Sequence, residues 1–164
     1  MDMGRIQQEL QQRTPFKTSA EEAMVGLLRT TDVARRQLTA VVEAHGITLQ
    51  QYNVLRILRG GGDQGVPTLE VGARMIEETP GTTRLLDRLE AKELVRRERC
   101  KQDRRQHLCW ITKQGTTLLK KLEQPMQAAG EAVLHRLTHQ DRLELIRLLD
   151  AVRASQDSTT TPTS

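Results

Sequence analysis

Aromatic side chains are nearly absent from this 164-residue chain, which contains one Phe, one Tyr and one Trp. Proteins that bind single-stranded nucleic acid, and the sheets that recognise RNA, stack bases on aromatic rings. Phe16, Tyr52 and Trp110 are too few to build such a platform. Among nucleic acids, duplex DNA is therefore the expected partner.

Cysteine and long hydrophobic runs are also scarce. Cys100 and Cys109 are too few for a disulfide scaffold, and we expect both to be thiols in a reducing compartment. No apolar stretch is long enough to span a membrane, and the first residues, MDMGRIQQELQQ, lack the apolar core of a signal peptide. These absences predict a cytoplasmic protein with no membrane contact.

The residue types that catalysis needs do not occur at productive spacings. The cluster Gly60-Gly61-Gly62 lacks the Gly-Lys-Ser/Thr ending of a phosphate-binding loop, and no apolar strand precedes it. His135 and His139 are four residues apart, but we expect Thr138 to interrupt the helix between them, and no further ligands lie nearby. We predict that the chain is not an enzyme and has no catalytic residue, metal site or cofactor.

Positive charge, in contrast, is concentrated in one segment. Between Pro80 and Arg105 there are nine basic and five acidic residues, and this excess of four equals the formal net charge of +4 of the whole chain. The rest of the chain is neutral on balance. A local basic segment of this kind is typical of a surface that meets the phosphates of DNA.

Apolar residues at helical spacing predict long helices at both ends of one domain that covers residues 20–152. Residues 20–44 and 116–152 form these terminal helices, with Thr138 and Asp141 as the capping box of the last one. Between them, residues 48–113 show short helical patterns, a basic strand, a charged turn and a second strand. We expect a mainly α (α+β) fold, a winged helix-turn-helix with long terminal dimerisation helices. Residues 1–18 should form a flexible arm, and residues 155–164 a disordered tail.

Threonines mark the expected starts of the short helices. Thr48 can cap a helix that ends at the glycine cluster, and Thr68 a helix that runs to about Ile76. Thr79 is the expected cap of the next helix, with Pro80 at its first position, where the missing N–H costs nothing. Gly72 should allow that next helix to approach closely.

The helix predicted over residues 80–92 has two distinct faces. Leu85, Leu86 and Leu89 cluster on one side, which we expect to pack on the core. The opposite side presents donors that suit guanine edges and phosphates. We predict that its DNA-contacting residues are Thr83, Arg84, Asp87 and Arg88.

A hairpin that pairs residues 95–100 with residues 107–112 follows this helix. Its basic turn suits a narrow minor groove, where the negative potential is enhanced. Asp103 is placed to accept hydrogen bonds from the turn backbone or from an arginine and so to support the turn. The DNA-contacting residues predicted on this hairpin are Arg97, Lys101, Arg104 and Arg105.

Two segments resemble the MarR family of bacterial transcription regulators. Asp103-Arg104-Arg105, followed after five residues by Ile111-Thr112-Lys113-Gln114-Gly115, is similar to the family's Asp-x-Arg and Leu-Thr-x-x-Gly pattern in the wing. The stretch PGTTRLLDRLE at residues 80–90 is similar to the family's recognition helix. The chain departs from the family at Glu93, which stands where a glycine usually follows that helix. A left-handed cap at Glu93 would cost about 1 kcal/mol, or the helix ends differently.

The resemblance implies a homodimeric repressor that binds a pseudo-palindromic operator in double-stranded DNA and is released by a small-molecule effector, a metal or an oxidant. The residues alone also favour a homodimer, since terminal helices with apolar faces are most easily covered by a second copy. The alternative is a winged-helix protein-interaction or architectural module, against which the outward Arg84 and Arg88 argue. We interpret Cys100 and Cys109 as packing or bystander thiols, while a redox switch at Cys100, beside Arg99 and Lys101, stays open.

Overall fold

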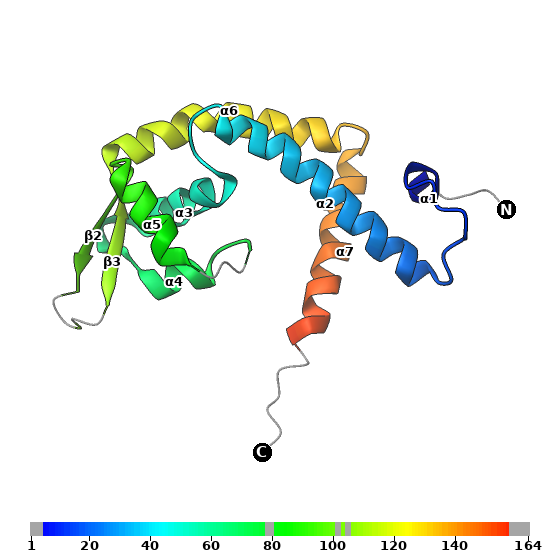
Figure 1. Ribbon diagram of the computed structural model, residues 1–164, viewed down its shortest axis with the longest axis horizontal. Helices are drawn as coiled ribbons and strands as arrows, with labels where there is room; N and C mark the ends of the chain where they lie inside the picture. Colours follow the sequence, from blue (N-terminus) through cyan, green and yellow to red (C-terminus); the bar gives the residue numbers. More distant parts are fainter. Residues whose placement is uncertain (1–4, 78–80, 101–102, 104–105, 158–164) are drawn as a thin grey trace, which may run out of the picture.

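A computed structural model of the chain describes residues 5–77, 81–100, 103 and 106–157. It is mainly helical, with one small sheet, and confirms the expected fold class (Figure 1). The elements in chain order are α1 (Arg5–Glu9), α2 (Ser19–Glu43), α3 (Leu49–Gly60), the short 3-10 helix η1 (Gly62–Gln64), β1 (Val66–Pro67), α4 (Thr68–Ala73), α5 (Thr82–Ala91), β2 (Val95–Arg99), β3 (His107–Ile111), α6 (Lys113–Leu134) and α7 (His139–Asp157).

A winged lobe forms from α3, α4, α5 and an antiparallel sheet with the strand order β1-β3-β2. Val95 pairs with Ile111 and Arg99 with His107, so the two strands predicted for the hairpin do pair, each one residue shorter than predicted. The core of this lobe is built from aliphatic side chains of the helices and from the inner face of the sheet. Its fully buried members include Val54, Leu55, Leu58, Val71, Leu86, Leu89, Val95 and Cys109.

Side-chain caps start α2, α3, α6 and α7, and the sequence predicts two of them, Thr48 at α3 and Thr138 at α7. Thr48 and Gln51 form a complete capping box at α3, and the Thr112 hydroxyl accepts a hydrogen bond from the Gly115 N–H at the start of α6. At α7, the Asp141 N–H donates to Thr138 Oγ1 at 3.2 Å, and the Thr138 N–H donates to Asp141 Oδ2 at 2.9 Å. Each cap satisfies backbone donors that the first helical turn leaves without a partner.

Two predicted helix starts in the lobe are wrong. Thr68 does not cap α4, because its hydroxyl donates to the His107 carbonyl of β3 at 3.3 Å, and the helix ends at Ala73 rather than near Ile76. The next helix begins at Thr82 instead of Pro80, and its cap is Gly81 in a left-handed conformation with φ 112°. Thr79 and Pro80 lie outside the described residues. At α4, a tertiary hydrogen bond takes the hydroxyl that the sequence assigns to the cap. At α5, the conformation of Gly81 sets the first helical residue.

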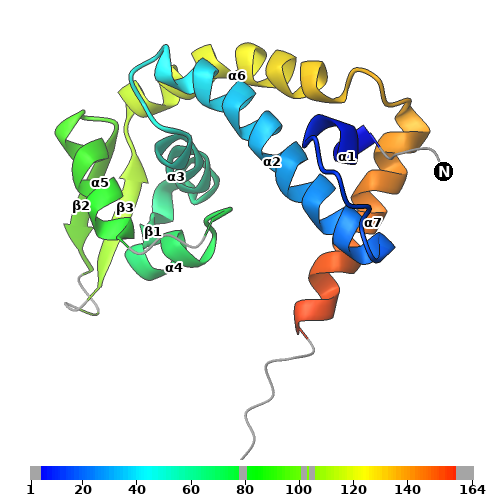
Figure 2. The ribbon, with the colours of Figure 1, turned by 45° about the vertical axis from the view of Figure 1, so that its right-hand side comes forward.

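The long helices extend away from the lobe (Figures 1 and 2). Helix α2 packs along α6, and α7 follows at the far end of α6. Among the described residues, no helix combines the length and apolar character needed to cross a membrane. The last helix reaches Asp157, so the predicted disordered tail begins too early; residues 158–164 lie outside the described part. Residues 5–9 form a short helix that the sequence does not predict.

Candidate nucleic-acid interface

Helix α5 presents the two faces that its sequence predicts. Leu85, Leu86 and Leu89 are buried against the lobe, while Thr83, Arg84, Asp87 and Arg88 are exposed. The apolar residues recur at helical spacing, so burying one stripe necessarily turns the polar positions outward. An exposed helix with hydroxyl and guanidinium donors can enter the major groove of DNA and reach base edges.

Close packing fixes the start of this helix against α4. A Cβ atom placed on Gly72 would lie 3.1 Å from Thr82 Oγ1, tighter than an ordinary contact. The sequence predicts this close approach. A larger residue at position 72 would press on the Thr82 side chain, at the first residue of α5, which would have to shift by a few tenths of an ångström.

The end of α5 is a left-handed cap without glycine. Glu93 has φ 59°, its N–H donates to the Glu90 carbonyl at 2.8 Å, and the Leu94 N–H donates to the Leu89 carbonyl at 3.0 Å. These two bonds define a Schellman motif. The Thr112 hydroxyl also donates to the Glu93 carbonyl at 2.7 Å. The conformation is therefore the one that the resemblance assigns to glycine, and Glu93 is held in it by backbone bonds to the last turn of α5 and by the hydroxyl of Thr112, the cap residue of α6.

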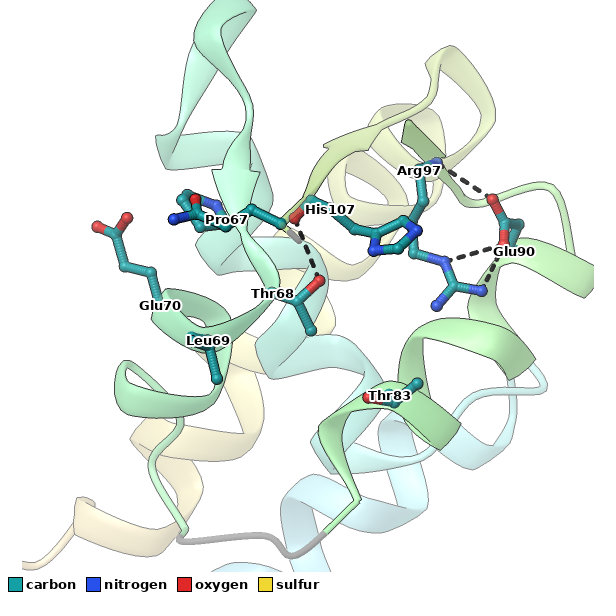
Figure 3. Close-up of a pocket in the computed structure, with 9 residues that line it drawn as sticks. Pro67, Thr68, Leu69, Glu70, Thr83, Glu90, Arg97 and His107 are labelled. Carbon is teal, nitrogen blue, oxygen red and sulfur yellow. Dashed lines mark hydrogen bonds and ion pairs between the residues drawn. The ribbon is translucent and has the colours of Figure 1, made fainter. Parts of the chain in front are cut away.

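Arg97 lies on β2 and bridges the strand to α5, a role that the sequence analysis missed. Its guanidinium donates to Glu90 Oε2 from Nε at 2.9 Å and from a terminal nitrogen at 2.7 Å, and it also pairs with Asp87 (Figure 3 shows Arg97 and Glu90). Burial lowers the pKa of Arg97, but the hydrogen bonds and charges of Glu90 and Asp87 outweigh this effect and raise the pKa above its ordinary value. Arg97 and Asp87, both predicted to contact DNA, are thus ion-paired to one another.

A signal for this pairing exists in the strand alternation. Arg97 is directly opposite Cys109 in the sheet, and its side chain is only 19% exposed. Residues on the same face of a strand alternate, so Arg97 shares the face of the buried Val95. A charged side chain on an inward face needs a partner, and the structure supplies it in Glu90 and Asp87 of α5 rather than in Glu98, which is adjacent in sequence but on the other face of the strand.

The base of the wing is anchored to the lobe by Trp110. Its indole N–H donates to the Asp63 carbonyl at 3.0 Å, and the Arg96 guanidinium lies 4.1 Å from the centre of its ring. A Cβ on Gly65 would come within 2.5 Å of the Trp110 ring, and Gly65 has φ 73°. The loop after α3 therefore needs glycine at this position. The contact of Trp110 with this loop fixes the position of strand β3 relative to α3.

The wing turn itself is described only in part. The Cys100 N–H donates to the Gln106 carbonyl, and the Gln106 N–H donates to the Asp103 carbonyl, each at 2.9 Å. Lys101, Arg104 and Arg105, which the sequence assigns to DNA contact, lie outside the described residues. Their role stays a prediction.

A cavity lies between α4, α5 and the two strands of the wing (Figure 3). This cavity has a volume of about 710 Å³, and the side chains of Thr68, Thr83, Arg97 and His107 line it. These side chains thus come from four elements, α4, α5, β2 and β3. The hydroxyls and the imidazole offer hydrogen-bond partners to a polar backbone that passes across this surface.

The cysteines differ in their surroundings. Cys109 is fully buried, and burial raises the pKa of its thiol above the ordinary value. This favours the protonated form, which is a poor nucleophile. Cys100 is half-buried at the end of β2. His135 and His139 lie on opposite sides of the α6–α7 turn, and the described part of the chain holds no group of three or more residues suited to bind a metal ion.

Comparison with known proteins shows to which family this fold is similar. The model of the MarR family matches residues 47–107, which cover α3 to the start of β3. The crystal structure of a MarR transcription factor from Planctomyces limnophilus is 35% identical, with a TM-score of 0.66, and the match covers 83% of this chain and 98% of that one. The chain belongs to the MarR family. Members of this family are transcriptional regulators rather than enzymes.

Two curated relatives extend the comparison of this MarR-family chain. The transcriptional regulator TtmR of Methylorubrum extorquens is 34% identical over 88 residues, which are 54% of this chain and 44% of that protein. The homoprotocatechuate degradative operon repressor of Escherichia coli is 25% identical over 126 residues, 77% of this chain and 84% of that protein. The chain spans about half the length of the curated regulators that it matches at 33% and 34% identity.

Proposed function

We propose that this MarR-family protein is a homodimeric repressor that binds a pseudo-palindromic operator in double-stranded DNA. The observation that carries the proposal is the outward face of α5, where Thr83, Arg84 and Arg88 are exposed beside a basic wing. Arg84 makes a bidentate contact to a base edge in the major groove, and the wing arginines follow the neighbouring minor groove. Asp87 and Arg97 hold α5 and the wing at a fixed angle.

Two copies are needed because the terminal helices leave apolar side chains uncovered. On α2, Met24 and Leu28 are 54% and 64% exposed, and on α7, Ile146 and Val152 are 56% and 50% exposed. Such a surface is best covered by the same surface of a second chain. The dimer would set two copies of α5 about one helical turn of DNA apart, about 10 base pairs centre to centre.

The effector of this regulator would bind where the long helices meet the lobe. A cavity of about 240 Å³ lies between α2, α3, α6 and the segment after α4, with Leu38, Tyr52 and Met126 among its apolar lining residues. Arg35 and Glu77, which form an ion pair, also line it. A small, partly apolar molecule in this cavity would change the angle between lobe and dimer helices, and with it the spacing of the two copies of α5.

Repression is favoured over activation by one relative, the homoprotocatechuate degradative operon repressor. The alternative is a winged-helix module that binds a protein partner or packages DNA without sequence preference. Exposed arginines at the centre of α5 favour sequence recognition over this alternative.

The test starts from fragments of the source genome that the full chain selects. Binding of the parent and of Arg84→Ala is then measured on a selected site and on random duplex DNA at the same salt concentration. We expect Arg84→Ala to cost about 1–3 kcal/mol on the selected site and little on random DNA. Arg153→Ala, a change at an exposed arginine of α7, is the matched control and should bind as the parent does. Equal affinity of the parent for selected and random DNA would contradict the proposal and favour the packaging module.

A second variant tests the wing. Arg105→Ala should weaken both kinds of site and reduce the salt dependence of binding by about one unit of slope, because one phosphate contact is lost. If a folded Arg105→Ala dimer binds both sites as the parent does, the wing makes no contact through this residue.

A further inference from the structure

Another cavity, of about 720 Å³, lies where α5 ends and α6 begins, beside the turn between α2 and α3. Strand β3 runs from the wing turn to this point, so the cavity is at the end of the hairpin opposite to the wing turn (Figure 1). Three lysines line it, Lys92 from the end of α5 and Lys113 and Lys121 from α6, together with His45. None of these residues belongs to the proposed DNA-contacting set.

The charge of this cavity is of one sign. No Asp or Glu is among its described lining residues, and within the described part of the chain none of the three lysines forms an ion pair. Lys113 and Lys121 are eight residues apart on one helix, so they share a face and lie about 12 Å apart along its axis. The three ammonium groups are exposed, so solvent screens their mutual repulsion, but each can donate a charge-assisted hydrogen bond to an anion bound in the cavity.

The floor of the cavity is apolar. Ile47 and Leu94 line it and are almost fully buried, and the half-buried Leu118 lies between the two α6 lysines in sequence. An inorganic anion would leave these apolar side chains exposed to solvent, whereas a ligand with a hydrocarbon or aromatic part would cover them. The cavity thus combines cationic groups for a charged head with an apolar surface for a body.

We propose that this cavity binds a small organic dianion with an apolar body, of the type of a phosphate monoester or an aromatic dicarboxylate. A ligand with two negative charges suits this cavity better than one with a single charge, since its anionic oxygens can accept charge-assisted hydrogen bonds from more than one of the three lysines.

The position of Lys92 connects the ligand to the recognition helix. Lys92 is the C-cap residue of α5, its ammonium group donates to the Gly46 carbonyl, and its own carbonyl accepts a hydrogen bond from Gln114 Nε2 at 3.4 Å. A dianion in the cavity competes with the Gly46 carbonyl for this ammonium group. Ligand binding is therefore sensed at the end of α5 without any contact to the DNA-facing side.

Calorimetric titration of the full chain without DNA tests the site. The probes are phenyl phosphate and phthalate, with inorganic phosphate and phenol as controls, at pH 8 and matched ionic strength, where the phosphate monoester is a dianion. We expect one saturable site per chain for phenyl phosphate, for phthalate or for both, and affinities for inorganic phosphate and phenol that are weaker by about tenfold or more. If inorganic phosphate binds as tightly as phenyl phosphate, or no probe saturates, the proposal is wrong.

Lysine variants locate the binding. The double variant Lys113→Gln, Lys121→Gln should weaken phenyl phosphate by about tenfold, whereas Lys120→Gln should bind as the parent does. Lys120 is exposed on the same helix but does not line the cavity, so it controls for net charge. Circular dichroism checks that each variant is folded. An equal loss in Lys120→Gln, or no loss in a folded double variant, would overturn the assignment. So would a double variant that keeps phenyl phosphate affinity but loses affinity for random duplex DNA, because the lysines would then serve the phosphate backbone.

Discussion

The winged lobe and the terminal helices bury their apolar side chains by different means. Within the lobe, Leu55, Leu86 and Leu89 are almost fully buried by elements of the same chain. On α7, by contrast, no described side chain is buried, and Leu143 and Ile146 are 46% and 56% exposed. The lobe is complete in one chain, whereas the terminal helices form an apolar surface that one chain leaves open. The difference separates residues that hold the fold from residues that, as proposed, hold two copies together.

The largest effect is expected in the lobe. Leu86→Ala should lower the free energy of unfolding by about 2–5 kcal/mol, because it removes a fully buried side chain and leaves a cavity. Urea denaturation measures the change. Leu69→Ala, at a residue that is 85% exposed in the same lobe, is the matched control and should change stability little. Similar losses in the two variants would show that burial in one chain does not set the stability of the lobe.

A charge introduced on the exposed apolar surface of α7 should weaken the proposed dimer rather than destabilise the lobe. Ile146→Asp should raise the dissociation constant of the proposed dimer about tenfold to a hundredfold, about 1–3 kcal/mol, because a carboxylate would be buried without a partner. Light scattering over a dilution series gives the constant. Leu69→Asp places the same charge on the exposed lobe residue and should leave assembly unchanged. A parent that is monomeric at micromolar concentration would contradict the proposed dimer outright.

At the end of the recognition helix, in contrast, one substitution is expected to raise the free energy of unfolding. Glu93→Gly should raise the free energy of unfolding by about 1 kcal/mol, since Glu93 has φ 59° and glycine adopts this conformation without strain. Ala91→Gly, at the last residue of α5, should instead lower it, by up to about 1 kcal/mol. Urea denaturation of both variants compares them directly. Destabilisation by Glu93→Gly would mean that the glutamate side chain has a role that outweighs backbone strain.

The smallest effect is expected at the start of α7. Hydrogen bonds from the Thr138 hydroxyl and N–H hold the pKa of Asp141 below its ordinary value. A depressed carboxyl pKa means that the stabilisation is fully present above the ordinary value of about 4 and is lost as the pH falls through the lower folded value. Asp141→Asn should therefore flatten the decrease of stability below about pH 4. Denaturation curves of parent and variant at several pH values test this, and parallel pH profiles would count against it.

Much of the candidate interface could be predicted from residue spacing. The leucines of α5 recur at helical intervals, so their burial and the exposure of Thr83, Arg84 and Arg88 follow from one periodic pattern. The two strands of the hairpin also follow from the sequence, which places them within one residue of their observed ends, but their register, with Val95 opposite Ile111, is seen only in the structure. Local caps such as Thr48 with Gln51 also require only residues that are close in sequence.

Contacts between distant segments could not be predicted in this way. Thr68 has the right residue type for a helix cap, yet its hydroxyl bonds to the backbone of β3, which is 39 residues away. Arg97 was assigned to DNA by its charge, but the packing of β2 against α5 brings it to Glu90 and Asp87. The start of α5 at Thr82 follows the left-handed conformation of Gly81, and at this point Gly72 of α4 lies close to the Thr82 side chain.

The sequence by itself determined the mainly helical fold, the amphipathic recognition helix and the concentration of positive charge, because periodicity, capping and charge are local properties. Only the tertiary structure decided which polar groups face one another: Arg97 and the carboxylates of α5, Trp110 and the loop after α3, and the three lysines around one cavity. It also showed that the lobe closes its own core while α7 leaves its apolar residues exposed. The physical reason is that burial and electrostatic pairing depend on distance in space, which a chain acquires only when segments far apart in sequence pack together.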